Sequence, residues 1–135
     1  MNADITISKF LLERIKSTED EMISLDTALV FQWDKLLIVK PYITEAELLR
    51  YKPDISNLSQ LDFSDKRYND GINTLVFITK KKAVRLLELP QYPCCNFSFR
   101  GDSEILLLIS KNTPVFNITK KVEGKQTSYT LELRK

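Results

Sequence analysis

The chain contains no histidine, and this absence excludes several kinds of chemistry at once. Histidine is the most common general base in proteins, and it is also a frequent zinc ligand. A Ser-His-Asp triad, a Cys-His nucleophile pair and a histidine metal site are therefore all excluded. The chain also has only 3 glycines and neither of the common glycine-rich phosphate-binding motifs. Loops that bind phosphate groups through their backbone need several glycines, so a site of this kind is excluded as well.

Cysteine is nearly as scarce, and the only two cysteines, Cys94 and Cys95, are adjacent. Such a pair cannot supply a disulfide framework, a Cys-x-x-Cys redox motif or a four-ligand zinc site. Neighbouring α-carbons lie about 3.8 Å apart across a trans peptide, below the usual disulfide range. We therefore expect two reduced thiols that point to opposite faces of a strand, and no metal or cofactor. A vicinal redox pair is the alternative.

Long apolar runs are absent as well. The longest run covers residues 105–109, whereas a membrane-spanning helix needs about 20 apolar residues. The N-terminus also lacks a basic start followed by an apolar segment, so no signal peptide is visible. With 43% apolar and 28% charged residues, the composition is typical of a soluble globular protein. We expect one domain that covers residues 1–135 and has no transmembrane segment.

Charge is distributed unevenly along the chain. Residues 1–70 hold 9 basic and 13 acidic side chains, a net charge of −4, and residues 71–135 hold 11 basic and 5 acidic ones, a net charge of +6. This asymmetry predicts a basic face that meets an acidic partner, either another protein or an anionic surface. Its centre would be formed by lysines of two hairpin ends: Lys80, Lys81, Lys82, Lys120, Lys121 and Lys125. The alternative is that these lysines only discourage strand pairing. No RNA-binding motif orders the basic residues, so we expect no specific nucleic-acid binding.

Two short helices are predicted in the first half of the chain. Residues 5–16 have apolar side chains at helical spacing. The second helix starts at a capping box formed by Thr44 and Glu47, with Ile43 and Leu48 as a hydrophobic staple. Pro53 ends this helix after about two turns.

Strands follow from apolar runs and from alternation of apolar and polar residues. A strand is expected to begin near Ala28, and the others cover residues 36–40, 74–78, 83–89, 96–99, 104–110, 115–122 and 127–134. A short helix capped by Asp102 is the alternative for residues 104–110. The alternation in the last strand favours an antiparallel sheet with one wet face. The predicted fold class is α+β: a mostly antiparallel, meander-like sheet of about six strands, with the two helices packed on one face.

The segment Trp33-Asp34-Lys35 interrupts the strand pattern, because Lys35 falls on the face that would hold Phe31 and Trp33. A β-bulge at Asp34 and Lys35 would align Phe31 and Trp33 with the apolar residues at positions 36 and 38. Trp33 would then anchor the core and Asp34 would bind local backbone. The functional alternative is that Asp34 and Tyr42 mark the mouth of a cleft between strand and helix.

The same segment resembles a family of small bacterial proteins, many of them predicted lipoproteins. The matching residues are Phe31, Trp33, Asp34, Lys35, Pro41 and Tyr42, followed by the strand at residues 75–78 and the lysines at residues 80–82. The chain departs from that pattern at Ile43 and in having no lipid-attachment cysteine before the domain. The resemblance implies a domain of the bacterial envelope and transfers no catalytic residues.

These observations predict a non-enzymatic binding or interaction domain. The candidate binding residues are Trp33, Asp34, Tyr42, Lys80, Lys81 and Lys82. We expect it to be the soluble part of an envelope lipoprotein if a signal sequence precedes it. The alternative is a cytoplasmic immunity-type protein that neutralises another protein. A third hypothesis is an enzyme that pairs Asp34 with Asp62, Asp65 or Asp70, since carboxylates can perform acid–base chemistry without histidine.

Overall fold

The computed structural model describes residues 2–18, 21–29, 31–61, 71–99 and 105–134. Asp62, Asp65, Asp70 and Asp102 lie outside these ranges. In chain order, the elements are α1 (Ile5–Ser17), β1 (Met22–Ser24), α2 (Leu25–Ala28), β2 (Lys35–Val39), α3 (Glu45–Tyr51), η1 (Leu58–Gln60), β3 (Ile72–Thr79), β4 (Lys82–Pro90), β5 (Asn96–Ser98), β6 (Ile105–Ile109), η2 (Ser110–Asn112), β7 (Val115–Glu123) and β8 (Gln126–Leu133).

The described strands form two sheets instead of the single meander that the sequence predicted. The first sheet has the order β1-β7-β8-β5 and the second has the order β4-β3-β2-β6. All neighbours are antiparallel except β5 and β8, which are parallel. The α+β class is confirmed. The meander stops at β4 because the N-terminal segment binds its outer edge: the Asp4 N–H donates to the Leu86 carbonyl and the Glu88 N–H donates to Ser8 Oγ.

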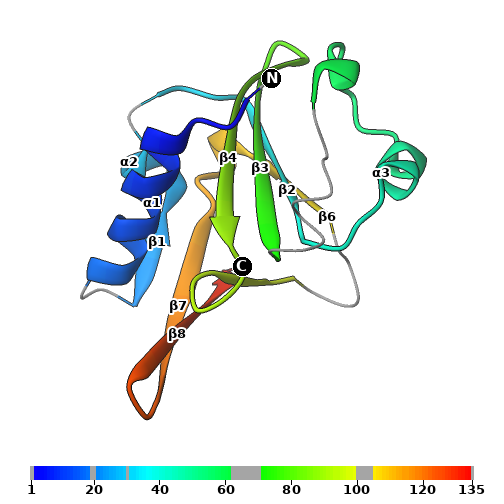
Figure 1. Ribbon diagram of the computed structural model, residues 1–135. Coiled ribbons are helices and arrows are strands. Elements are labelled where there is room, and N and C mark those ends of the chain that lie inside the picture. Colours follow the sequence, from blue (N-terminus) through cyan, green and yellow to red (C-terminus); the bar gives the residue numbers. More distant parts are fainter. Residues whose placement is uncertain (1, 19–20, 30, 62–70, 100–104, 135) are drawn as a thin grey trace.

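The second sheet is buried on both faces, and this explains where the helices lie. In β2 the residues from Leu36 to Val39 are all buried, so each face of the strand needs its own cover. Leu36 and Ile38 belong to one core cluster together with α1, whereas Leu37 and Val39 belong to another together with α3. Figure 1 shows α1 and α3 on opposite sides of the sheet. The prediction that both helices pack on one face is therefore wrong.

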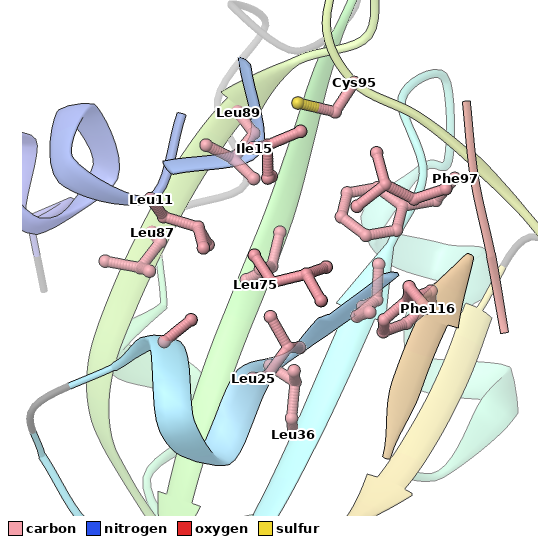
Figure 2. Packing of buried hydrophobic residues seen from close by; sticks show 14 of the residues in the cluster. Leu11, Ile15, Leu25, Leu36, Leu75, Leu87, Leu89, Cys95, Phe97 and Phe116 are labelled. Atoms are coloured by element: carbon pink, nitrogen blue, oxygen red, sulfur yellow. The ribbon is translucent and has the colours of Figure 1, made fainter. Parts of the chain in front are cut away.

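The larger core fills the space between the two sheets and α1. Figure 2 shows Leu11 and Ile15 of α1 on one side of Leu75, with Phe97 and Phe116 on the other. The Phe97 and Phe116 rings meet edge to face, with centroids 5.5 Å apart. Each fully buried side chain of this size contributes about 1.5–3 kcal/mol through removal of apolar surface from water. This core holds β7 and β8 of the first sheet against the second sheet.

Local signals placed most element boundaries correctly. Helix α3 begins after Thr44, whose Oγ1 accepts the Glu47 N–H at 3.1 Å, and its C-cap is Lys52, directly before Pro53. Residues 105–109 form β6, as the strand reading of that segment predicted. The strand expected near Ala28 is wrong. Residues 25–28 form the helical turn α2, because Leu25 and Ala28 lie three positions apart and both enter the core.

Candidate interaction surface

Trp33 lies in the core, beside one end of β2. Its side chain is 5% exposed, and its ring meets Phe77 edge to face with centroids 5.6 Å apart. Phe31 also contacts Phe77 edge to face, and both Trp33 and Phe31 pack in the cluster that holds Leu36 and Ile38. The grouping predicted from the sequence is therefore confirmed. Trp33 is therefore a core residue that packs against Phe77 beside one end of β2.

Asp34 and Lys35 face a single residue of β3, as the predicted bulge requires: the Asp34 N–H donates to the carbonyl of Ile78, and Ile78 is also the register partner of Lys35. From Lys35 onward β2 keeps an unbroken register with β3 and with β6. Phe31 and Trp33 precede the strand and pack in the same core cluster as Leu36 and Ile38. A second irregularity lies in the pairing of β3 and β4, where the register shifts between Phe77 and Ile78.

Asp34 fastens the turn between β3 and β4. Its Oδ2 accepts the Lys80 N–H at 2.8 Å, its own N–H donates to the Ile78 carbonyl, and its carbonyl accepts the Ser110 N–H. A pocket of about 300 Å³ lies beside it, lined by Phe31, Gln32, Trp33, Asp34 and Ser110. The only charged group on this lining is the Asp34 carboxylate, and that group is already bound to backbone. This pocket therefore offers little to a charged ligand.

The three lysines of the predicted site lie at the β3–β4 turn and are exposed. Lys80 and Lys81 have positive φ angles of 50° and 66° and occupy the tight turn itself. Asp34 approaches the backbone of the turn, and Asp54 Oδ2 lies 3.6 Å from Lys81 Nζ. Two carboxylates therefore offset part of the charge of Lys80, Lys81 and Lys82. Of the predicted site residues, Trp33, Asp34 and the three lysines of this turn therefore lie close together, at one end of the second sheet.

Tyr42 lies beyond the opposite end of β2. Its side chain is 56% exposed, and its hydroxyl oxygen lies 3.3 Å from the position that a Cβ atom would take on Gly71. Asp34 and Tyr42 therefore do not share one cleft mouth, because the whole of β2 separates them. Gln91 also lies against Gly71, and its N–H donates to the Gly71 carbonyl. Tyr42 thus stands near the loop that follows β4.

A second surface is built by the hairpin of β7 and β8. In the described part of the chain, strand β1 pairs with residues 115–117 of β7, and β5 pairs with residues 130–132 of β8. Residues 119–128, here called the arm, extend past both neighbours. In Figure 1 the arm projects from the end of the molecule that lies opposite the β3–β4 turn. The two lysine groups therefore do not form the single basic face that the sequence predicted.

The two faces of the arm have different surroundings, because successive side chains of a strand point to opposite faces. On one face Lys120 Nζ donates to the Thr18 carbonyl, and the Tyr129 hydroxyl donates to the Lys16 carbonyl, both near the end of α1. The other face borders a groove of about 240 Å³. The arm and β8 contribute Lys121, Glu123, Gln126, Ser128 and Thr130 to this groove, and the facing wall is formed by Gln91, Tyr92, Pro93 and Asn96.

The arm is more basic than the β3–β4 turn. It carries Lys120, Lys121 and Lys125 against the single carboxylate of Glu123, which lies 2.9 Å from Lys121 Nζ. Lys125 has no ionic partner among the residues that the structure describes. Exposed ion pairs such as Lys121 with Glu123 are weak, because water screens them. The arm therefore presents an uncompensated positive charge beside the groove.

Among the residues that the structure describes, the outer edge of β8 has no neighbouring strand at Thr127, next to the groove. The Tyr129 N–H points away from β7, because it donates to the Pro93 carbonyl at 2.9 Å. In an antiparallel pair the backbone direction alternates along the strand, so the N–H and C=O of Thr127 point the same way as those of Tyr129. Within the described ranges, no strand pairs with β8 at Thr127. This backbone could accept an added strand.

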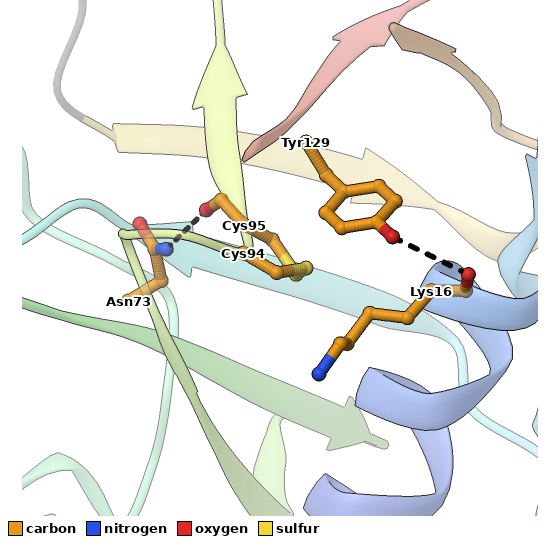
Figure 3. The surroundings of a disulfide bond; sticks show 5 residues. All are labelled: Lys16, Asn73, Cys94, Cys95 and Tyr129. Carbon is orange, nitrogen blue, oxygen red and sulfur yellow. Dashed lines mark hydrogen bonds between the residues drawn. A yellow bond between two sulfur atoms is a disulfide. The ribbon is translucent and has the colours of Figure 1, made fainter. Parts of the chain in front are cut away.

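The loop opposite the arm is tied to the core. Cys94 and Cys95 are joined by a disulfide bond and are 1% and 0% exposed. The prediction of two free thiols is therefore wrong. Asn73 Nδ2 donates to the Cys95 carbonyl at 2.7 Å (Figure 3), and the Cys95 N–H donates to the Pro90 carbonyl. These contacts fix the loop that carries Tyr92, whose side chain is 62% exposed.

Sequence reasoning identified the lysines of the arm but missed Tyr92 and the polar residues of β8. The alternation of Ser128, Thr130, Glu132 and Arg134 with apolar or larger residues indicated one wet face of β8. Nothing in the sequence indicated that residues 91–93 lie opposite that face. Comparison with known families, curated proteins and solved structures finds no match for this chain. In the described ranges, no helix has the length and apolar character to cross a membrane, and no cluster of His, Cys, Asp and Glu could hold a metal.

Proposed function

We propose that the chain is a non-enzymatic interaction domain that binds an acidic, extended segment of another protein in the groove beside the arm. The observation that carries this proposal is the open edge of β8 next to exposed lysines. An extended peptide can add to such an edge through backbone hydrogen bonds, while neighbouring side chains select its sequence. Here Lys121 and Lys125 favour acidic side chains, and Tyr92 supplies an aromatic wall.

The choice of a protein partner rests on the open backbone of Thr127. Lipid headgroups carry acceptors but cannot reproduce the alternating donors and acceptors of a strand. A single exposed apolar side chain on the arm, Val122 at 70% exposure, is also little for insertion into a membrane. An acidic protein segment can pair both with the lysines of the arm and with the backbone N–H and C=O of Thr127.

The proposal extends to location through the resemblance of residues 31–42 to bacterial lipoproteins. In a domain anchored at the envelope, the groove would be accessible to an extended segment of a neighbouring envelope protein. The genomic sequence upstream of the codon for Met1 tests this part of the proposal. A signal with a lipid-attachment cysteine would support it. A start codon without such a signal would place the domain in the cytoplasm and favour a protein-neutralising role.

The experiment uses a fluorescent peptide of alternating glutamate and threonine, whose binding is followed by anisotropy. Lys121→Gln combined with Lys125→Gln should weaken binding by about five- to tenfold at low salt, since two favourable charge contacts are lost. Lys80→Gln combined with Lys82→Gln removes the same charge from the opposite end and serves as the matched control. This control should bind the peptide about as tightly as the unmodified protein.

Equal weakening by the two double variants would contradict the proposal, because it would show that only the net charge of the protein matters. Vesicles that contain phosphatidylglycerol provide the second arm of the experiment. Tight vesicle binding with no peptide binding would show that the arm recognises a lipid surface, and would also overturn the proposal. Binding of the peptide should fall as salt is raised through the physiological range, where the Debye length is about 8 Å.

A further inference from the structure

The disulfide between Cys94 and Cys95 joins neighbouring residues, and this limits what it can contribute to stability. A disulfide stabilises a fold mainly by closing a loop of the unfolded chain, and the effect grows with the length of that loop. A bond with a sequence separation of 1 encloses no intervening residue, so it adds little stability of this kind. The bond therefore acts chiefly on the local backbone, between β4 and β5.

Backbone contacts connect the disulfide to the groove beside the arm. On one side, the Cys95 N–H donates to the Pro90 carbonyl of β4, and the Cys95 carbonyl accepts Asn73 Nδ2 of β3 at 2.7 Å. On the other side, the Pro93 carbonyl accepts the Tyr129 N–H of β8 at 2.9 Å. Residues 91–93, here called the wall, line the groove directly before the disulfide. The disulfide therefore lies between a part of the chain held by the second sheet and a wall held by β8.

The disulfide lies in the larger core. Cys94 and Cys95 are both buried, and they belong to the cluster that also contains Ile15, Leu89 and Tyr129. Figure 3 shows Tyr129 among the side chains that surround the disulfide. Two thiols need more space than a disulfide, because sulfur atoms that are not bonded separate to van der Waals contact. A closely packed core has little spare volume, so formation of two thiols has to displace a neighbouring segment.

We propose that the Cys94–Cys95 disulfide is a redox switch, and that its reduction releases the wall from β8 and weakens binding in the groove. The displacement falls on the wall because Tyr92 is exposed to solvent, whereas Cys95 is held by two hydrogen bonds to the second sheet. In the reduced form the hydrogen bond from Tyr129 N–H to the wall is lost. The inference rests on the proposed function, since the groove is where the acidic segment binds.

A dithiol is the class of reductant that this switch requires. One thiolate of the dithiol attacks a sulfur of the pair and forms a mixed disulfide, and the second thiol of the reductant then displaces that sulfur. The bond between Cys94 and Cys95 breaks, both sulfurs end as thiols with one proton each, and the two electrons come from the dithiol, which becomes a disulfide. Because both cysteines are buried, attack requires local opening of the wall. A bound peptide should therefore slow reduction.

The first test measures amide hydrogen exchange of the unmodified chain before and after reduction with dithiothreitol. The Tyr129 N–H should exchange about tenfold faster in the reduced form, because its acceptor in the wall is lost. The matched control is the Ile118 N–H on β7, which donates to the Glu21 carbonyl at 2.7 Å and should be unaffected. Equal acceleration at both amides would show that the bond stabilises the whole fold. That result, or no acceleration at Tyr129, would overturn the proposal.

The second test compares how tightly the oxidised and the reduced protein bind the alternating glutamate–threonine peptide. Reduction should weaken binding by about five- to tenfold, and the peptide should by linkage favour the oxidised form by the same factor. Cys94→Ala combined with Cys95→Ala has no bond to break, so dithiothreitol should leave its affinity unchanged.

The outcomes separate this inference from the proposed function. Equal peptide affinity of the oxidised and reduced forms would overturn the switch and leave the groove as a binding site. No binding to the oxidised form would instead contradict the proposed function. In that case the exchange rate of the Tyr129 amide still decides whether the wall responds to reduction.

Discussion

Two buried amide side chains act as backbone partners at positions where regular pairing is incomplete. Asn57 Oδ1 accepts the Ala83 N–H at 2.7 Å, and its Nδ2 donates to the Ala83 carbonyl at 3.0 Å. Ala83 lies at the register shift between β3 and β4. Asn57 therefore replaces a neighbouring strand for one residue of β4, and it is only 8% exposed. Asn73, which is completely buried, holds Cys95 in a similar way through one hydrogen bond.

Removing the Asn57 amide should be costly. In Asn57→Ala the buried N–H and C=O of Ala83 lose their partners, and each unsatisfied group costs about 1–3 kcal/mol. We therefore expect the free energy of unfolding to fall by about 2–4 kcal/mol, measured by urea denaturation. Asn112→Ala, at an exposed position of η2, is the control and should change stability by less than about 0.5 kcal/mol. Similar losses for the two variants would show that the Ala83 contact is unimportant.

Trp33 provides a second test at the level of one residue. Its burial against Phe77 predicts a blue-shifted fluorescence that iodide quenches poorly. Trp33→Ala should lower the free energy of unfolding by about 3–5 kcal/mol, because a large aromatic side chain leaves a cavity. Tyr92→Ala, which removes an exposed ring, should change stability by less than about 0.5 kcal/mol. A red-shifted, freely quenched tryptophan would instead identify Trp33 as a surface residue.

The role of Trp33 could be predicted from its neighbours, whereas that of Asp34 could not. Apolar residues on both sides of Trp33 indicated a place in the core. The hydrogen bond from Lys80 N–H to Asp34 joins residues 46 positions apart. No local pattern records such a partner, because it depends on how β2 and the β3–β4 turn meet in the folded chain. The opposing positions of Tyr92 and the arm were hidden for the same reason.

At the level of elements, α3 is the part in which sequence and structure agree most closely. Thr44 and Glu47 gave the start of the helix, and Pro53 gave its end. Thr44→Ala should destabilise the protein by about 1 kcal/mol, since the Glu47 N–H loses its acceptor. Thr44→Ser retains the acceptor and should be nearly neutral. Thermal unfolding of both variants checks this, and equal melting temperatures would contradict the assigned cap.

The arrangement of the elements was harder to predict than their boundaries. The strand alternation in β8 led to an antiparallel sheet with one wet face. Yet the uninterrupted apolar runs of β2 and β3 required a cover on each face, and this separates α1 from α3. The division into two sheets depends on the N-terminal segment taking the edge of β4. That contact joins Asp4 and Ser8 to residues about 80 positions later, which periodicity cannot reveal.

The loop between β4 and β5 carries the disulfide, and its oxidation state is directly measurable. The intact mass before reduction should be lower by two hydrogens, about 2 Da, than after reduction. Because the disulfide leaves no thiol to alkylate, iodoacetamide should label neither cysteine in the denatured but unreduced protein. Labelling of two thiols without prior reduction would show that the bond is absent and would restore the original expectation of free cysteines.

The molecule as a whole has two lysine-bearing ends that differ in their local charge. At the β3–β4 turn Asp34 and Asp54 lie close to the lysines, whereas the arm has only Glu123. Net charge alone cannot distinguish the two ends, because both lie in the basic half of the sequence. Their separation in space, together with the groove and the open edge of β8, favours the arm as the place where an acidic segment binds.

The most direct test of this account is an NMR titration of the isotope-labelled protein with the alternating glutamate–threonine peptide. The account predicts that the largest amide shifts fall on Tyr92, Lys121 and Thr127, around the groove and the edge of β8. Amides of the β3–β4 turn should shift little, although they are also close to lysines. Largest shifts at Lys80 and Lys81, or at the Trp33 indole, would contradict the assignment of the binding site to the arm.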